Sequence, residues 1–515
     1  MTFMNAMKNT LDNEYNVSVT ENGAVGYRTT GKALLDLNFA VASLRRASEE
    51  EIAQKFIKAF AEDPVIAMKW MFFARDAREG LGERRLFRVV IAALMKSNPE
   101  MVIPVIKLIA EYGRFDDMWC LLDNEESAKV VYKIVDDQLT EDLKNMEAGK
   151  SISLLAKWMP SANASSKQTK KYAKQLYKAL GLTEREYRKA MSKFRKYLDV
   201  VEVKMSSKNW SEINYEAVPS RANLIYNGAF LRNDEERRRD YLSKLEKGEA
   251  KINAGTLYPH DIVHKYMSGR GYWSTSLKAK DATLEELWKA LPDNVEGYGN
   301  TIVVADGSGS MCTPVGGTNV TALSVANALA IYFAERSSGQ FKDKYITFSE
   351  RPQLVDFSRC QSLHGKIQKA LAHNEMANTN IEAVFDLILT TAIKGNMTQE
   401  EIPQNILIVS DMEFDTCARC NGGWRDRPSQ KLFDTIAQKY AAAGYKLPRL
   451  VFWNVNSRTG TIPVKENDLG VALVSGFSTN ICKMVMSGET DPYKCLLETL
   501  NAPRYDAVEQ ALTNK

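Results

Sequence analysis

The stretch from Thr301 to Ser310, Thr-Ile-Val-Val-Ala-Asp-Gly-Ser-Gly-Ser, constrains the fold of this chain more than any other. Its apolar first half predicts a short buried strand, and Asp306 stands at the carboxyl end of that strand. The two glycines that follow allow a tight turn, so the hydroxyls of Ser308 and Ser310 converge on the Asp306 carboxylate. Oxygen ligands of this kind suit Mg²⁺. The stretch therefore predicts a strand that ends in part of a metal site.

A second carboxylate follows a strand in the same way. Residues 405–410 are almost continuously Ile, Leu and Val, as in a strand covered on both faces, and Asp411 comes next. Ligands bind at the carboxyl ends of strands in open α/β sheets, so we expect both carboxylates to meet there. Thr379, just before a predicted helix, adds a hydroxyl. The predicted metal ligands are two carboxylates and three hydroxyls: Asp306, Ser308, Ser310, Thr379 and Asp411.

This all-oxygen set favours Mg²⁺, with Mn²⁺ or Ca²⁺ as alternatives. The protein ligands leave a coordination position for water or for an acidic side chain of a partner. A competing interpretation is that Asp306 and Asp411 only cap helices. The chain has four histidines, none near this motif, and it lacks a Gly-Lys-Ser/Thr phosphate loop. We therefore expect a binding protein and not an enzyme.

From residue 300 onward, predicted strands and helices alternate, which is typical of an open, mostly parallel α/β sheet. The predicted strands are 302–305, 345–348, 353–357, 405–410, 449–454 and 471–474, and the second and third form a hairpin. The predicted helices are 321–336, 363–372, 380–394, 429–443 and 479–486.

Before residue 300 the apolar residues recur at helical spacing. Asp63 followed by proline predicts a helix start, and Thr183 with Glu186 forms a capping-box pattern. Short helices joined by tight links predict an all-α repeat domain, a HEAT-like solenoid or ring. The predicted division is an N-terminal arm over residues 1–30, a helical repeat domain over 31–299, and an α/β domain with C-terminal helices over 300–515.

Positive charge is concentrated in one part of the helical region. The chain has a net charge of +4, but residues 157–208 contain 14 Lys or Arg against 4 Asp or Glu. Such concentration favours an anionic partner, most often nucleic acid. Tyrosines and phenylalanines lie between these charges, as in proteins that bind single-stranded nucleic acid. The alternative is a pair of solvated helices whose aromatic residues form their buried faces.

Other features of the sequence concern membrane segments, the cellular compartment and possible zinc ligands. The 515 residues contain no apolar run near 18 residues and no secretory signal, so we expect no membrane segment. Seven cysteines, an odd number, indicate a reducing compartment, and we expect a cytoplasmic protein. Cys417 and Cys420 have the spacing of a zinc or redox pair without a second pair nearby. His260 and His264 have helical zinc-ligand spacing without a third ligand.

The metal motif resembles that of the von Willebrand factor A fold, whose metal-ion-dependent adhesion site has the pattern Asp-x-Ser-x-Ser, then Thr, then Asp. The resemblance covers residues 300–490 and assigns the five predicted ligands in the same order. It departs from the family at Thr379, where Asn-Thr-Asn replaces a commoner glycine-rich loop. It implies that the metal binds a partner's carboxylate and performs no chemistry.

The stretches Ala74–Arg84 and Tyr112–Asp117 are similar to parts of the TROVE module of Ro ribonucleoproteins. In those proteins a ring of helical repeats precedes a von Willebrand A domain. The resemblance implies binding of small noncoding RNAs or of the ends of misfolded RNAs. Leu155–Ser161 and Pro219–Ala222 are similar to the DUF2828 family, found in cells and phages.

Our interpretation is a non-enzymatic, Ro-like RNA-binding protein with a Mg²⁺-dependent docking domain. The alternative is a metal-dependent protein–protein scaffold that does not bind RNA and captures an acidic side chain of its partner. The predicted RNA-binding residues belong to the basic stretch and to a glycine-punctuated link on the inner rim of the ring: Lys167, Lys170, Lys171, Lys174, Arg188, Lys189, Lys193, Arg195 and Lys196, with Arg75, Arg78, Arg84 and Arg85.

Overall fold

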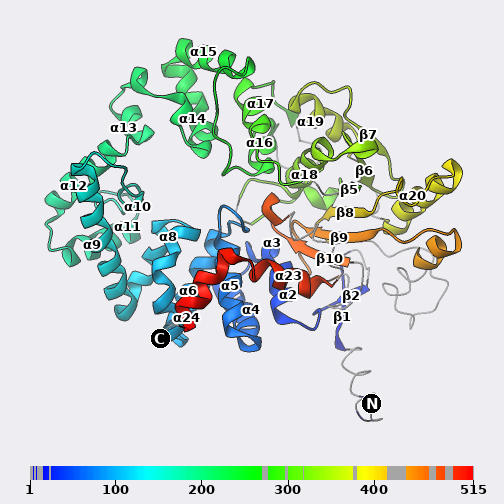
Figure 1. The fold of residues 1–515 in the computed structure, drawn as a ribbon, viewed down its shortest axis with the longest axis horizontal. Helices are drawn as coiled ribbons and strands as arrows, with labels where there is room; N and C mark the ends of the chain where they lie inside the picture. Colours follow the sequence, from blue (N-terminus) through cyan, green and yellow to red (C-terminus); the bar gives the residue numbers. More distant parts are fainter. Residues whose placement is uncertain are drawn as a thin grey trace. The chain divides into compact units, whose positions relative to one another are not determined.

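The computed structural model describes Met4, Met7 and residues 15–21, 25–268, 276–295, 300–316, 318–374, 380–413, 436–462, 471–481 and 491–513. The chain forms two compact units, and each unit combines segments that are distant in sequence. The first unit comprises Met1–Glu62 and Leu257–Thr499, and the second comprises Asp63–Thr256 and Leu500–Lys515. Figure 1 labels the helices and strands of both units.

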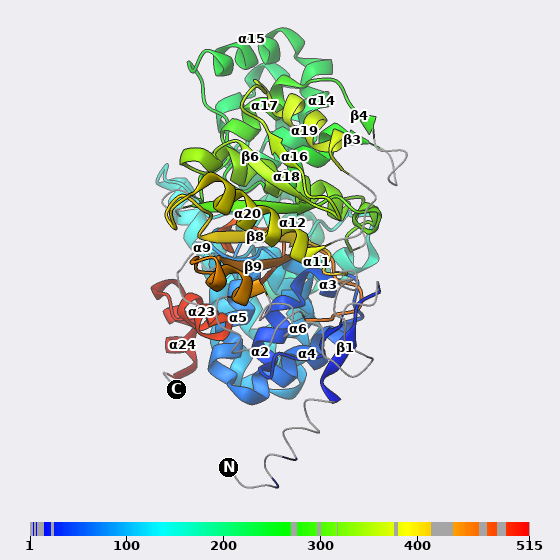
Figure 2. The same ribbon diagram turned by 90° about the vertical axis from the view of Figure 1, so that its right-hand side faces the viewer.

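The first unit is organised around a six-stranded sheet in the order β10-β9-β8-β5-β6-β7. All neighbours are parallel except β6 and β7, which form the predicted antiparallel hairpin. Figure 2 shows β6, β8 and β9 at successive levels of this sheet. The strands are β5 (Thr301–Asp306), β6 (Lys344–Phe348), β7 (Leu354–Asp356), β8 (Asn405–Ser410), β9 (Arg449–Asn454) and β10 (Val471–Ser475). The predicted α/β sheet is confirmed.

The central strands are covered on both faces, which explains their unbroken apolar sequences. All six residues of β5 are buried, and so are the last five residues of β8 and β9. Helix α18 (Ala322–Arg336) packs against β5, β6 and β8 and is itself buried along most of its length. Enclosed strands of this kind hold the residues at their carboxyl ends in fixed positions.

Further helices and small hairpins complete the first unit. Two hairpins, β1 (Val17–Val19) with β2 (Val25–Tyr27) and β3 (Met267–Ser268) with β4 (Ser276–Leu277), lie outside the main sheet. The helices are α2 (Ala33–Phe39), α3 (Val41–Leu44), α4 (Glu49–Glu62), α16 (Pro259–Tyr266), α17 (Ala282–Lys289), α18, α19 (Leu363–Ala372), α20 (Ile381–Gly395) and α23 (Pro492–Leu500), with 3-10 turns η6 (Gly309–Cys312), η7 (Gly339–Phe341) and η8 (Thr479–Ile481).

The second unit is entirely helical in its described residues. Its α-helices are α5 (Pro64–Arg75), α6 (Arg84–Ser97), α7 (Pro99–Val102), α8 (Ile109–Tyr112), α9 (Glu125–Glu147), α10 (Leu155–Trp158), α11 (Lys167–Ala179), α12 (Glu184–Tyr197), α13 (Val201–Ser206), α14 (Ser220–Asn233), α15 (Glu235–Glu246) and α24 (Asp506–Thr513). Its 3-10 helices are η1 (Ile103–Leu108), η2 (Phe115–Asp123), η3 (Trp210–Glu212), η4 (Tyr215–Ala217) and η9 (Pro503–Tyr505). The HEAT-like repeat and its closure into a ring stay predictions.

The predicted helix starts are confirmed by their caps. The Asp63 carboxylate accepts the backbone N–H of Ile66 at 3.0 Å at the start of α5. At the start of α12, Thr183 and Glu186 form the reciprocal capping box, with N–H to oxygen distances of 2.8 and 3.3 Å. These side chains satisfy N–H groups that a helix leaves without an internal partner, so local sequence alone fixes where the helices begin.

The compact units divide the chain differently from the boundaries predicted at residues 30 and 299. Residues 31–62 and 257–299 lie in the unit of the sheet, because α2 packs against β10 and α16 packs against α18. Residues 500–515 lie in the helical unit, because α24 packs against α5 and η1. The predicted arm contains the β1–β2 hairpin, whose Tyr27 pairs with Ile462 in the first unit.

None of the helices in the described ranges combines the length and apolar character that crossing a bilayer requires. Four described cysteines, Cys120, Cys312, Cys360 and Cys495, form no disulfide bond. Cys417 and Cys420 lie outside the described residues.

Candidate functional site

The carboxylate of Asp306 stands at the end of β5, where it is 1% exposed. Its Oδ1 accepts the backbone N–H of Ser308 at 2.9 Å, and its Oδ2 accepts the hydroxyl of Ser410 at 2.6 Å. The hydroxyl oxygens of Ser308 and Ser310 lie 3.0 Å apart. The turn after β5 therefore gathers one carboxylate and two hydroxyls, as the sequence predicts.

Asp411 follows β8, the strand paired in parallel with β5, so both carboxylates reach the same edge of the sheet. Burial, followed by the nearby charge of Asp306, raises the pKa of Asp411 to about 7. The charge of Arg458 and a hydrogen bond with the Ser310 side chain lower this pKa in part. Nη1 of Arg458 lies 3.3 Å from Oδ2 of Asp411. Two buried carboxylates thus share an edge with one cationic side chain.

These four residues fit a hard divalent cation, because they offer two carboxylates and two hydroxyls within one small region. Oδ2 of Asp411 faces the Arg458 guanidinium, so a bound cation would share this oxygen with Arg458 or displace it. Thr379, the fifth predicted ligand, lies outside the described residues. The competing interpretation, in which both aspartates only cap helices, does not account for their proximity.

Other predicted metal ligands do not form a cluster. Over the described part of the chain, no three His, Cys, Asp or Glu side chains gather into a group that could hold a metal. His260 is buried between aromatic rings, stacked on Tyr258 at 5.6 Å and in edge contact with Phe477 at 5.0 Å. A core position explains this histidine without a metal.

A loop after β9, residues 457–461, is a part of the site that sequence reasoning missed. Glu413, 2% exposed, accepts the backbone N–H of Arg458 at 2.7 Å and of Thr459 at 2.9 Å. It also accepts the backbone N–H of Glu21 at 2.9 Å. Glu413 therefore fixes the loop that carries Arg458 to Asp411. The only sequence signal for the role of Glu413 was that a charged residue stands two positions after Asp411.

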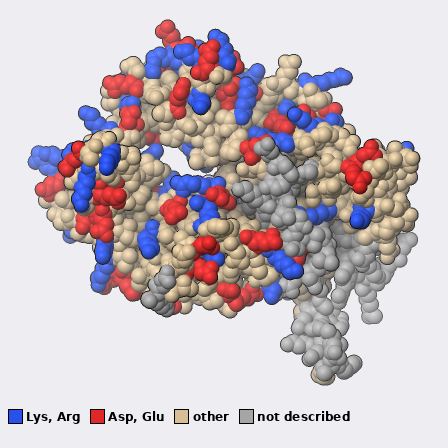
Figure 3. Space-filling model, in the orientation of Figure 1, with Lys and Arg blue, Asp and Glu red and all other residues tan. Residues whose placement is uncertain are grey.

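The basic stretch forms helices α11 and α12, and most of their charged residues are exposed. Their buried residues are Ala173, Leu176, Tyr187, Met191 and Phe194. Tyr187 and Phe194 are 1% and 6% exposed, so these aromatics belong to the buried face. The exposed Lys and Arg side chains of the two helices define the basic surface: Lys167, Lys170, Lys171, Lys174, Lys178, Arg185, Arg188, Lys189, Lys193 and Lys196. In Figure 3, the region of α11 and α12 carries Lys and Arg side chains interspersed with acidic and uncharged ones.

Arg195 does not belong to this basic surface. It is half-buried, and its Nε and Nη2 donate to the carbonyls of Ala156 and Met159, both at 2.8 Å. Arg195 therefore ties α12 to the carbonyl groups of α10 and of the residue that follows it. A guanidinium bound to two carbonyls is not available to RNA, so this predicted contact is corrected.

Arg75 is likewise a structural residue, in contrast to its predicted place on an RNA-binding rim. Its side chain is 4% exposed, and its Nε and Nη2 each lie 2.7 Å from Oδ2 of the fully buried Asp117. Arg88 binds the other oxygen of Asp117 at 2.7 Å. Gly113 is required here, because a Cβ at that position would lie 2.6 Å from Oδ2 of Asp117. Arg78, Arg84 and Arg85 are exposed.

The two motifs that resemble the TROVE module thus form one buried polar cluster. Asp76, fully buried, accepts Nε and Nη2 of Arg504 at 2.5 and 3.0 Å. Tyr505, next along the chain, stacks on Tyr112 at 5.7 Å. The motif residues fix the second unit through paired charges, and this structural role is sufficient to explain their pattern.

Comparison with known proteins places the chain among relatives. It is 31% identical over 525 residues to the protein named "Uncharacterized protein L728" of Acanthamoeba polyphaga mimivirus, covering 94% of this chain and 87% of that protein. The chain belongs to the L728 family. In this L728-family chain, residues 300–504 match the domain of unknown function DUF7788, and residues 20–118 and 162–300 match the domain of unknown function DUF2828.

The predicted resemblance to DUF2828 is therefore confirmed. Of the two stretches that carried it, Pro219–Ala222 lies inside the matched ranges and Leu155–Ser161 lies between them. Among solved structures, the crystal structure of the Deinococcus radiodurans RO (RSR) protein aligns with 86% of this L728-family chain and 92% of its own, at 13% identity and a TM-score of 0.45. A score of this size does not establish a shared fold. The von Willebrand A resemblance stays a prediction.

Proposed function

We propose that this protein is a non-enzymatic RNA-binding protein that contacts the phosphate backbone through the basic surface of α11 and α12. The observation that carries the proposal is the segregation of these helices into a buried apolar face and an exposed cationic one. Residues 167–197 hold 11 Lys or Arg against 2 acidic residues, Glu184 and Glu186. The resemblance of residues 74–84 and 112–117 to the TROVE module favours small noncoding or misfolded RNA as the ligand.

The chemistry of this surface supports contact with phosphates more than with bases. Of the five aromatic residues of the two helices, Tyr187 and Phe194 are buried, Tyr172 and Tyr177 are half-buried and Tyr197 is exposed, so few rings are fully available for base stacking. Lysine dominates the surface, and it binds phosphate as a point charge without reading base edges. Lys171 also contacts Asp123 at 2.5 Å, an exposed pair that RNA can replace at little cost. We therefore expect affinity that depends strongly on salt and weakly on sequence.

The test uses fluorescence anisotropy of the full chain with labelled single-stranded and hairpin RNAs over a range of salt concentrations. The variant replaces four exposed lysines of the basic surface by glutamine: Lys170, Lys174, Lys189 and Lys193. Loss of four phosphate contacts reduces the slope of log K against log salt by about 3 for single strands. The matched control replaces four exposed cations of α14, of α15 and of the residue that caps α15: Arg232, Arg239, Lys244 and Lys247. Absence of RNA binding at low salt, or equal loss in both variants, would refute the proposal.

A second candidate function is Mg²⁺-dependent capture of an acidic partner side chain, which the pairing of Asp306 with Asp411 favours. In this proposal Mg²⁺ is held by Asp306, Ser308, Ser310, Thr379 and Asp411. The cation supplies a position that attracts a carboxylate of the partner. The residues of the chain align the site, because the enclosed strands β5 and β8 hold both carboxylates at one edge.

The metal proposal is tested with the metal alone. Isothermal titration of the full chain with Mn²⁺ and Mg²⁺ is compared between wild type and Asp306→Asn, which keeps the shape of the side chain. Glu401→Gln, an exposed carboxylate that precedes the amino end of β8, is the control. We expect the heat of binding to disappear in the first variant only. Metal binding retained in Asp306→Asn would exclude this site.

A further inference from the structure

The side chain of Arg458 contacts the ligands of the candidate metal site. Its Nη1 lies 3.3 Å from Oδ2 of Asp411 and 3.5 Å from the backbone carbonyl oxygen of Ser310. The Asp411 side chain is 1% exposed, so water and salt screen this contact only weakly. A guanidinium in this position brings positive charge to the same carboxylate that a divalent cation would use. Arg458 and a bound cation therefore compete for Asp411.

The same guanidinium has a second carboxylate partner outside the site. Its Nη2 lies 2.6 Å from Oε2 of Glu21, whose side chain is 52% exposed. Nε of Arg458 has no hydrogen-bond acceptor among the residues that the structure describes. One terminal nitrogen thus contacts each carboxylate, so a rotation of the side chain can release Asp411 while the contact with Glu21 is kept.

Glu21 stands two positions after the end of β1, and a single buried carboxylate holds it beside Arg458. Oε2 of Glu413 accepts the backbone N–H of Glu21 at 2.9 Å, and Oε1 accepts the backbone N–H of Arg458 at 2.7 Å. The main chains of the two partners are therefore fixed to the same side chain, and only the Arg458 side chain has to move between Asp411 and Glu21.

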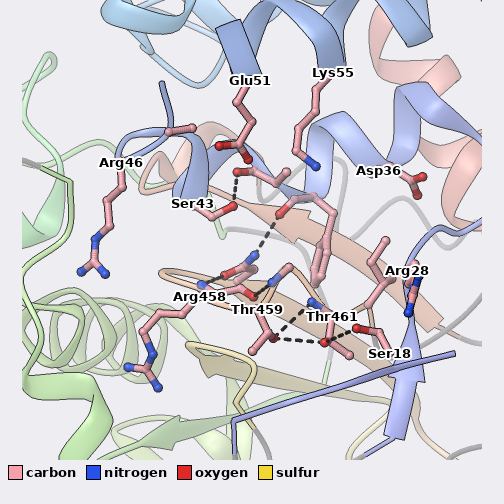
Figure 4. A pocket seen from close by; sticks show the side chains of 17 residues that line it. Ser18, Arg28, Asp36, Ser43, Arg46, Glu51, Lys55, Arg458, Thr459 and Thr461 are labelled. Carbon is pink, nitrogen blue, oxygen red and sulfur yellow. Dashed lines mark hydrogen bonds between the residues drawn. The ribbon is translucent and has the colours of Figure 1, made fainter. Parts of the chain in front are cut away.

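Further contacts hold the β1–β2 hairpin on the loop that carries Arg458. Tyr27 and Ile462 donate their backbone N–H groups to each other's carbonyl oxygens, both at 2.8 Å. The hydroxyls of Ser18 and Thr461 lie 3.0 Å apart. Figure 4 shows this link beside the open cavity of about 530 Å³ that the loop lines, with the Arg458 side chain extending away from the two hydroxyls. The docked hairpin therefore keeps Glu21 within reach of Arg458.

We propose that Arg458 regulates the candidate metal site as a competitor built into the chain, and that Glu21 of the N-terminal hairpin sets the strength of this competition. Without a bound cation, Arg458 neutralises Asp411. Arg458 withdraws to Glu21, the carboxylate partner that remains, when the site is occupied. Glu21 then stabilises the cation-loaded state more than the other, and only such a difference shifts the equilibrium. This inference rests on the metal site proposed above.

Isothermal titration of the full chain with Mn²⁺ in about 0.15 M salt compares wild type, Glu21→Gln, Arg458→Gln and the double variant. We expect Glu21→Gln to weaken Mn²⁺ binding about fivefold, because the displaced guanidinium then lacks a carboxylate partner. Arg458→Gln should tighten binding about tenfold. In the Arg458→Gln background, Glu21→Gln should change the affinity less than about twofold, because no guanidinium remains to be displaced.

The matched control is Glu401→Gln, which removes the same charge before the amino end of β8 and should bind Mn²⁺ as wild type does. Melting temperatures of all variants exclude unfolding as the cause. Equal affinity of wild type and Glu21→Gln overturns the proposal. An equal loss in both backgrounds also overturns it, because Glu21 then acts on the cation without Arg458.

The outcome for Asp306→Asn separates this inference from the metal proposal on which it rests. If wild type binds no Mn²⁺, or if Asp306→Asn still binds it, the metal site is wrong and the role of Arg458 is wrong with it. If Asp306→Asn loses binding while wild type, Glu21→Gln and Arg458→Gln bind equally, the metal site stands and only the role of Arg458 is refuted.

Discussion

Arg75→Ala distinguishes a structural arginine from an RNA contact, because its effect on stability follows from buried geometry. The substitution removes two charge-assisted contacts with the Asp117 carboxylate, from Nε and Nη2, both at 2.7 Å. Asp117 is fully buried and the Arg75 side chain is 4% exposed, so water cannot replace the lost contacts. The change therefore leaves a buried carboxylate with fewer partners.

The expected loss is about 3 kcal/mol of unfolding free energy. Removing one partner of a buried ion pair costs about 3–5 kcal/mol, since the other charge stays in a region of low polarity. Arg88 still binds Oδ1 of Asp117 at 2.7 Å, which places the expected loss at the lower end of that range. The control is Arg84→Ala, an exposed residue at the start of α6, for which we expect a change within about 0.5 kcal/mol.

Urea unfolding of the full chain, followed by far-ultraviolet circular dichroism, measures both variants, and RNA anisotropy measures their binding. We expect Arg75→Ala to be unstable, and its folded fraction to bind RNA with the wild-type dependence on salt. Two results would refute the reasoning: stability within about 1 kcal/mol of Arg84→Ala, or a stable variant whose RNA affinity is lost.

Three further predictions concern the same units. Gly113→Ala places a Cβ 2.6 Å from Oδ2 of Asp117, so we expect a loss of about 2–3 kcal/mol in urea unfolding, and a neutral result would contradict this close approach. Deletion of residues 500–515 removes the Arg504 contacts with Asp76 and should lower the melting temperature measured by differential scanning fluorimetry; an unchanged value would show that α24 does not stabilise the unit. Arg458→Gln removes the cation beside Asp411 and should tighten Mn²⁺ binding about tenfold by titration calorimetry, whereas weaker binding would mean that Arg458 supports the site.

Local signals in the sequence predicted the elements of the sheet. The apolar run of β8 and the turn after β5 are short, self-contained patterns, and both strands lie where they were predicted. The caps at Asp63 and Thr183 were equally readable, because a cap involves residues within one helical turn. The placement of residues 31–62 and 257–299 beside the sheet was not readable, since no local pattern states which surface an amphipathic helix covers.

The residues of the candidate sites also fall into those that local sequence predicted and those that only the folded chain revealed. The sequence placed Asp306, Ser308, Ser310 and Asp411 together, because the carboxyl ends of parallel strands share an edge. It could not separate Arg75 and Arg195 from the exposed cations of α11 and α12, because a charge alone does not reveal burial. It also missed Glu413 and Arg458, because Glu413 follows β8 while Arg458 lies in the loop after β9, and the two meet only in the folded chain.

By itself, then, the sequence determined the strands, the helix starts and the residues at the strand ends, because these depend on contacts between close neighbours along the chain. Only the tertiary structure decided which charges are buried in pairs and which face solvent. It also decided how Arg458 comes to stand beside the buried Asp411. The physical reason is that burial and charge pairing depend on segments hundreds of residues apart, which meet only when the chain is folded.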